Sequence, residues 1–106
     1  MNSYEFVIIV FCCMIRFIKG EYIMLEFKYD TQLLIEGKNL DENEIHTYFL
    51  ENFKGDCLLA VGDDELIKIH FHTNEPWKVL EYCATLGEIY DIVIEDMDRQ
   101  SRGLKG

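Results

Sequence analysis

Apolar and polar residues alternate at several places along the chain, and this spacing predicts strands. The spacing in residues 25–37 predicts a first strand, which ends at a glycine. One side of this strand carries Tyr29, Thr31, Leu33 and Ile35. The other side carries Lys28, Asp30, Gln32, Leu34 and Glu36. The short apolar run at 57–61 predicts a second strand. The Gly-Asp-Asp-Glu stretch at 62–65 predicts a hairpin turn into a third strand at 66–73. A fourth strand is expected at 88–96.

Two segments have helical spacing instead. In residues 40–53, Asp41 is expected to be the N-cap and Glu44 to complete a capping box. Apolar side chains then recur every four residues and predict one buried face, formed by Ile45, Phe49 and Phe53 with Tyr48 beside them.

A second helix is predicted after the third strand. Asn74 or Thr73 is expected to cap it, Pro76 fits its first turn, and Gly87 ends it. Its inner face is expected to consist of Trp77, Leu80, Cys83 or Ala84, and Leu86, with Trp77 as an anchor at the start of the helix.

The resulting order, β-α-β-β-α-β, is that of the ferredoxin-like split fold, in the α+β class. Right-handed crossovers place both helices on one face of a four-stranded antiparallel sheet. The first and third strands are expected to be central neighbours that run parallel. The predicted division is an N-terminal extension at 1–23, a domain at 24–97 and a polar tail at 98–106.

An unbroken apolar run at 6–15 is too short for a membrane-spanning helix, which needs about 20 residues. No positive charge precedes it and no small-residue cleavage site follows it, so a secretory signal is not indicated. Three interpretations stay open: a start codon placed too early, with Met24 as the true start; an added strand or helix packed on the domain; or a membrane anchor.

Composition and charge narrow the class of protein. A chain of 106 residues that is 49% hydrophobic predicts one small folded domain. The net charge of -10 belongs to residues 24–106, because two acidic and two basic residues cancel in the N-terminal extension. This charge argues against nucleic acid or an anionic membrane as partners.

The spacing of the four cysteines does not predict a disulfide framework. Cys12 and Cys13 are adjacent, whereas Cys57 and Cys83 lie inside apolar runs and are expected to be unreactive core thiols. No Cys-x-x-Cys pair indicates a zinc ribbon or redox site. A reducing compartment, the cytoplasm, is therefore expected.

Candidate chemistry centres on the stretch Ile-Lys-Ile-His-Phe-His-Thr at 67–73. His70 and His72 are two apart and so point to the same side of a strand. If the first and third strands are neighbours, the face without helices also carries Asp30, Gln32 and Lys68. Two interpretations stay open: a site for zinc or a similar metal with a fourth position open to water, or two solvated surface histidines.

Longer stretches resemble a known family. "YDTQLLIEGKNLDENEI", "LLAVGDDELIKIHFHTNEPWKVLEY" and "GEIYDIVIEDMDRQ" are similar to the middle domain of the fatty acid kinase A proteins, of the YloV type with a DAK2 domain. The resemblance covers about residues 27–100. Stand-alone copies of this module are sometimes named "kinase to dihydroxyacetone kinase".

The resemblance implies a place in lipid metabolism. Complete members of the family join an ATP-binding DAK2-type domain, this middle domain and a C-terminal domain, and phosphorylate fatty acids presented by a DegV-type partner. Their middle domain carries a metal site made of a cysteine on the first strand and the two histidines. The matching positions here are Asp30, His70 and His72. Carboxylate in place of thiolate gives a harder, weaker site for Zn²⁺.

Phosphoryl transfer needs a nucleotide cradle and Mg²⁺ ligands, and the sequence has no glycine-rich phosphate loop. Asp63 and Asp64 are expected to form a turn rather than a magnesium site, and His46 to lie on the surface. Three functions stay open. The favoured one is a non-catalytic accessory or regulatory module with a DegV-type protein, a separate DAK2 kinase or a second copy as partner. The others are a small metal-dependent hydrolase and a remnant without independent activity.

Overall fold

The structure is a computed structural model that describes residues 25–106. This part of the chain contains four strands and three helices. In chain order they are β1 (Tyr29–Glu36), α2 (Glu42–Asn52), β2 (Gly55–Gly62), β3 (Leu66–Thr73), α3 (Pro76–Leu86), β4 (Glu88–Asp96) and α4 (Met97–Ser101). The apolar run at 6–15 and its three interpretations lie outside the described residues. Within 25–106, no helix has the length and apolar character needed to cross a bilayer.

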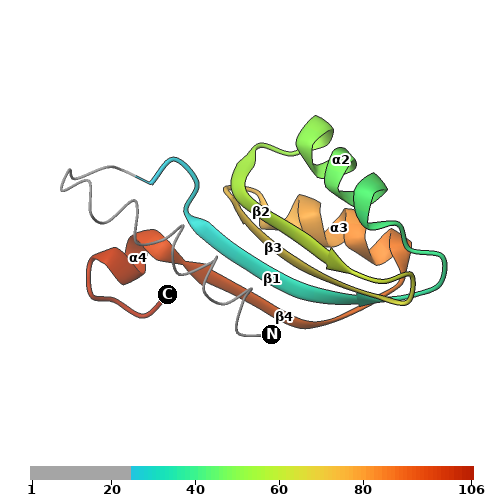
Figure 1. Ribbon diagram of the computed structural model, residues 1–106. Helices are drawn as coiled ribbons and strands as arrows, with labels where there is room; N and C mark the ends of the chain where they lie inside the picture. The colour runs from blue at the N-terminus through green and yellow to red at the C-terminus, as the bar shows by residue number, and fades with distance from the viewer. Residues whose placement is uncertain (1–24) are drawn as a thin grey trace.

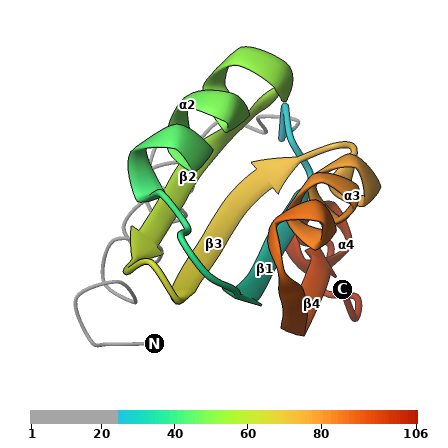
Figure 2. The ribbon, with the colours of Figure 1, turned by 90° about the vertical axis from the view of Figure 1, so that its right-hand side faces the viewer.

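The sheet has the strand order β2-β3-β1-β4, and α2 and α3 both pack on one of its faces (Figures 1 and 2). This confirms the predicted α+β class and element order. The predicted direction of β3 relative to β1 was wrong, because the two strands pair antiparallel. The crossover through α2 makes β2 parallel to β1, and the hairpin then reverses β3.

The core lies between the sheet and the two helices. Alternation on β1 and β3 directs one set of side chains towards them, and the Phe71 ring meets the Phe49 ring of α2 edge to face at a centroid distance of 5.3 Å. The fully buried apolar side chains are Leu33, Ile35, Ile45, Phe49, Ile67, Ile69, Phe71, Val79 and Cys83. The predicted inner face of β1 and the start of the α2 face, Ile45 and Phe49, are therefore confirmed.

The start of α2 and the turn between β2 and β3 were both predicted from the sequence, and both are present. Asp41 is the N-cap of α2, and its Oδ1 accepts hydrogen bonds from the backbone N–H groups of Asn43 and Glu44 at 3.0 and 3.1 Å. In the β2–β3 turn, Asp63 Oδ1 accepts from the N–H groups of Glu65 and Leu66, both at 2.9 Å. These two bonds lower the pKa of the Asp63 carboxyl and give it a structural role in the turn.

The start of α3 differs from the prediction. Its N-cap position is Glu75, not Asn74 or Thr73, although Thr73 Oγ1 accepts a hydrogen bond from the Glu75 N–H. Asn74 instead accepts from the Lys28 N–H and donates to the Glu26 carbonyl, tying the end of β3 to the segment before β1.

The inner face of α3 was also only partly predicted. Trp77 is 60% exposed, so it is not a helix-start anchor. Pro76, Val79 and Cys83 form the buried stripe at spacings of three and four, and Trp77 projects away from it. Leu80 and Leu86 are partly buried against the core, as expected.

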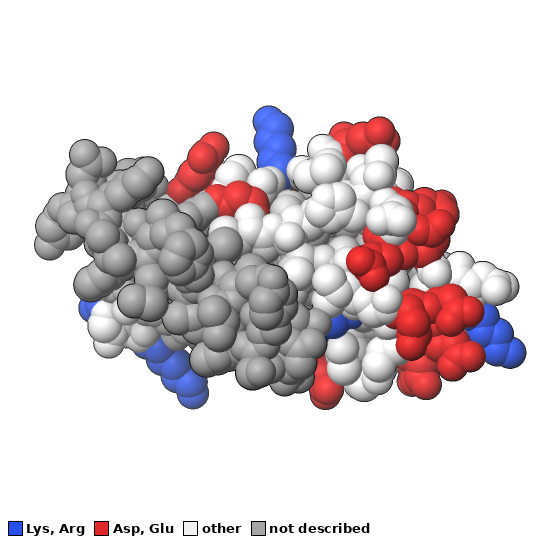
Figure 3. All heavy atoms as spheres, viewed as in Figure 1, with Lys and Arg blue, Asp and Glu red and all other residues white. Residues whose placement is uncertain are grey.

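The segment predicted as a polar tail contains the short helix α4. Asp96 caps it by accepting a hydrogen bond from the Arg99 N–H at 3.0 Å. At the opposite end of the molecule, acidic side chains gather around the β2–β3 turn and the start of α2 (Figure 3). Exposed residues there include Asp41, Glu42, Asp63 and Asp64, and their charge opposes the binding of polyanions at this end.

Candidate metal centre

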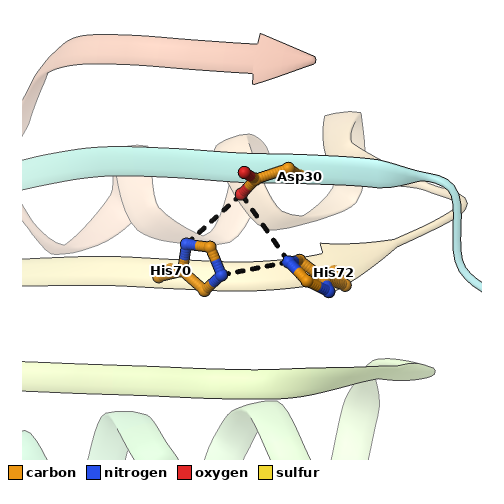
Figure 4. Close-up of side chains that lie close together, drawn as sticks. All are labelled: Asp30, His70 and His72. Carbon is orange, nitrogen blue, oxygen red and sulfur yellow. Dashed lines mark hydrogen bonds and ion pairs between the residues drawn. The ribbon is translucent and has the colours of Figure 1, made fainter. Parts of the chain in front are cut away.

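Two adjacent central strands bring an aspartate and two histidines together. Phe71 faces α2, so its neighbours His70 and His72 point to the side of the sheet opposite α2 and α3. In the antiparallel register Asp30 lies opposite His72, and Gln32 opposite His70. The three side chains converge on one another (Figure 4), which confirms the predicted juxtaposition even though the predicted strand direction was wrong.

The contacts within the cluster are short. Asp30 Oδ1 lies 3.2 Å from His70 Nδ1 and 3.9 Å from His72 Nε2. The Nε2 atoms of the two imidazoles are 3.1 Å apart, a hydrogen-bonding distance. Gln32 Nε2 donates a hydrogen bond to the other oxygen of Asp30 at 3.5 Å, which holds the carboxylate in place.

Burial sets this cluster apart from the solvated face that the sequence predicted. His70 and His72 are only 1% and 0% exposed, so the interpretation as solvated surface histidines is wrong. Alternation tells which side of a strand a residue faces, but not whether that side is covered. A position open to bulk water was expected beside these imidazoles, and their burial does not support it.

The burial shifts the acid–base behaviour of the cluster. Desolvation, reinforced by the nearby Lys68 charge, lowers the pKa of His70 from 6.5 to about 4. Burial also raises the pKa of the Asp30 carboxyl, and the nearby His72 partly offsets this effect. His70 is therefore neutral at pH 7, which is the form of imidazole that binds metals.

The donor atoms fit a zinc-type ion. A carboxylate oxygen and two imidazole nitrogens are ordinary zinc ligands, and donors around one tetrahedral Zn²⁺ lie about 3.3 Å apart when its bonds are about 2.0 Å long. Asp30 Oδ1 and His70 Nδ1 are both buried and make no hydrogen bond, although they face each other. Only one His70 nitrogen can bind the same ion as Asp30 and His72, and a metal bond to His72 Nε2 would replace its hydrogen bond with His70 Nε2.

A second group of potential ligands was missed by the sequence reasoning. Asp56, Cys57 and His72 each offer a ligand atom, and these atoms lie within 4.8 Å of one another. Cys57 was expected in the core, but it is only half-buried and sits at an irregularity of β2 with a φ of 53°. That irregularity breaks the strict alternation on which the prediction depended.

The other candidates behave as ordinary structural residues. Cys83 is fully buried, and desolvation raises the pKa of its thiol to about 12, which agrees with the expected unreactive core thiol. His46 is exposed on α2, as predicted.

Comparison with known proteins gives two concordant results. Residues 26–104 match the family model for the middle domain of fatty acid kinase A-like (FakA-like) proteins. Uncharacterized proteins of Staphylococcus epidermidis RP62A and Staphylococcus aureus USA300 are each 36% identical to the chain over 80 residues. The match covers 72% of this chain and 14% of each relative, so the chain corresponds to a small part of their length.

Proposed function

Because the chain belongs to the family of FakA-like middle domains, we propose that it is a non-catalytic accessory or regulatory module. In this proposal it works by protein contact in a fatty acid kinase and DegV-type lipid system in the cytoplasm. It also holds a metal ion, with Zn²⁺ as the first candidate, through Asp30, His70 and His72. The observation that carries the metal proposal is the convergence of these three side chains from β1 and β3, with both imidazoles buried.

A metal ion at this position would cross-link the two central strands. Its ligands come from residues far apart in the sequence, so binding would stabilise the folded chain and not the unfolded one. Catalytic zinc keeps an open coordination position for water or substrate. The burial of His70 and His72 favours a structural ion over the metal-dependent hydrolase, for which the sequence offers no separate general base.

The metal proposal predicts that the metal-depleted protein takes up one Zn²⁺ per chain. In a chain that also carries Cys57→Ser, which removes the thiol of the second group of potential ligands, His70→Ala is expected to lower zinc affinity by more than about 100-fold, because loss of an outer partner of a ligand already costs about 10–100-fold. Competition with a chromophoric chelator measures the affinity, and circular dichroism verifies that the variant is folded.

His46→Ala is the matched control, because His46 is exposed on α2 and outside the cluster. It should leave zinc affinity unchanged. Equal zinc affinity with and without His70→Ala in the Cys57→Ser chain would refute the proposed ligand set.

The partner proposal has a separate structural basis. Within residues 25–106, Trp77 is the most exposed of the aromatic side chains, at 60%, and tryptophan is enriched where protein partners bind. The partner is expected to be a DegV-type fatty-acid-binding protein or a separate DAK2 kinase.

We expect the tagged full-length chain to bind such a partner that has been purified separately. Trp77→Ala is expected to raise the dissociation constant at least about fivefold, because truncation of a central interface residue commonly costs more than about 1 kcal/mol of binding free energy. Surface plasmon resonance measures the dissociation constant. Leu104→Ala, at an exposed apolar residue in the C-terminal segment, is the control. If neither protein binds the chain, the accessory role in this lipid system is contradicted.

A further inference from the structure

The His72 ring lies between two different sets of metal ligands. Its Nε2 faces His70 and Asp30, whereas its Nδ1 lies 3.5 Å from Asp56 Oδ1 on β2. On that second side the Cys57 thiol belongs to the same group of ligand atoms. We propose that Asp56, Cys57 and His72 form a second metal site, which selects soft divalent ions and competes with the first site for His72.

The two sides of the His72 ring have different neighbours. Its Nε2 lies 3.1 Å from His70 Nε2 and 3.9 Å from Asp30 Oδ1, so this side of the ring belongs to the first cluster.

On the other side of the ring, His72 Nδ1 lies 3.5 Å from Asp56 Oδ1 on β2. In the tautomer of neutral His72 that has its lone pair on Nδ1, that nitrogen and the Asp56 carboxylate can both bind one cation between them. The two sides of the His72 ring can therefore serve two different sets of ligands.

The local backbone explains why two neighbouring residues of β2 can both contribute. In a regular strand the side chains of Asp56 and Cys57 would point to opposite faces of the sheet. The pairing of β2 with β3 is irregular between Asp56 and Leu59, and Cys57 has a φ of 53°. This departure from alternation leaves the ligand atoms of Asp56, Cys57 and His72 within 4.8 Å of one another.

The donor set determines the class of ion. Thiolate favours soft ions over Mg²⁺ or Ca²⁺, and the imidazole and carboxylate complete a common set for zinc-group metals. On binding, the Cys57 sulfur–hydrogen bond breaks, its proton passes to solvent, and the sulfur electron pair forms the bond to the metal. Because neutral His72 has one lone pair, it serves one site at a time, and the total is one ion per chain.

Cadmium tests this proposal, because thiolate–Cd²⁺ bonds give an ultraviolet charge-transfer band. The experiment uses the full chain, depleted of metal. Cys12→Ser and Cys13→Ser remove the two consecutive N-terminal thiols, which could otherwise bind Cd²⁺ themselves. We expect the band to saturate at one Cd²⁺ per chain. Cys57→Ser should abolish the band and weaken Cd²⁺ binding by more than about 100-fold, above the loss seen for outer-shell partners.

Further variants separate this site from the one in the proposed function. His72→Ala should remove the band, whereas His70→Ala should keep it. Loss of zinc binding at the Asp30 site is measured separately, with His70→Ala in the Cys57→Ser chain. Cys83→Ala, at a buried core thiol, should keep the band. Protection of Cys57 from iodoacetamide by Cd²⁺, mapped by mass spectrometry in the unsubstituted chain, gives a test that does not depend on the folding of any variant.

The proposal is overturned if the chain with both N-terminal cysteines replaced shows no band, or if Cys57→Ser leaves the band intact. Loss of the band in a folded His70→Ala variant would also overturn it, since the second site would then depend on the first. Absence of Cd²⁺ protection at Cys57 would do the same. Failure of zinc binding at Asp30 and His70 contradicts only the proposed function, so the two failures are distinguishable.

Discussion

Replacement of Phe49 by alanine is expected to lower the free energy of unfolding by about 3–5 kcal/mol, the usual cost of removing a large core side chain. Phe49 is fully buried on α2, and its ring packs edge to face against those of Phe53, Phe71 and Tyr82. Small domains have total stabilities of about 5–15 kcal/mol, so much of the stability of this protein would be lost. Urea unfolding followed by circular dichroism measures the change.

Leu50→Ala provides the matched control for this prediction. Leu50 is the next residue of the same helix, but its side chain is 66% exposed. The substitution should change stability by no more than about 0.5 kcal/mol, the range for surface positions. Equal losses for Phe49→Ala and Leu50→Ala would contradict the placement of the core between α2 and the sheet.

Acidification of the metal-free protein should have the second large effect, a loss of up to about 3 kcal/mol, given about 1.36 kcal/mol per pKa unit. The pKa of folded His70 is about 4, below its unfolded value of 6.5. The unfolded chain therefore binds more protons between these values, and stability must fall as pH decreases from about 6.5 to about 4. Above this window, His70 is neutral in both states and has no such effect.

Other groups with shifted pKa values act differently. The pKa of Asp30 is raised in the folded state, so as the pH falls the folded chain binds a proton at Asp30 before the unfolded chain does. This proton uptake opposes the loss of stability that His70 causes. Asp63 and Asp96 have lowered pKa values, and their contributions are lost below the window, as the pH falls through their folded values.

Urea titrations of chelator-treated protein at several pH values test the His70 prediction. His70→Gln should flatten the dependence, whereas His46→Gln, at the exposed histidine of α2, should keep it. A dependence that is unchanged by His70→Gln would assign the acid sensitivity to other residues.

The strands and longer helices could be predicted from the sequence because their periodicity depends only on neighbouring residues. The bounds of β3 and β4 match the predicted 66–73 and 88–96, and Asp41 caps α2 as expected. The direction of β3 relative to β1 was predicted wrongly because two successive connections determine it. The α2 crossover makes β2 parallel to β1, and the hairpin then makes β3 antiparallel to β2. Helix α4 was missed because its five residues are too few to show a helical period.

The candidate site was predicted in part for a similar reason. Asp30, His70 and His72 could be placed together because two neighbouring strands and their alternation determine that juxtaposition. Their burial could not be predicted, because alternation tells which side of a strand a residue faces and not whether that side is covered. Cys57 was assigned to the core because alternation does not anticipate a residue with a φ of 53°.

The exposed position of Trp77 makes this side chain a natural optical probe. It is the only tryptophan in the sequence, and its indole is already largely hydrated in the native state. Denaturation should therefore shift its emission maximum only slightly, so tryptophan fluorescence would be a poor measure of unfolding. A protein that covers the indole should instead shift the emission to shorter wavelength, which allows complex formation to be followed without any label.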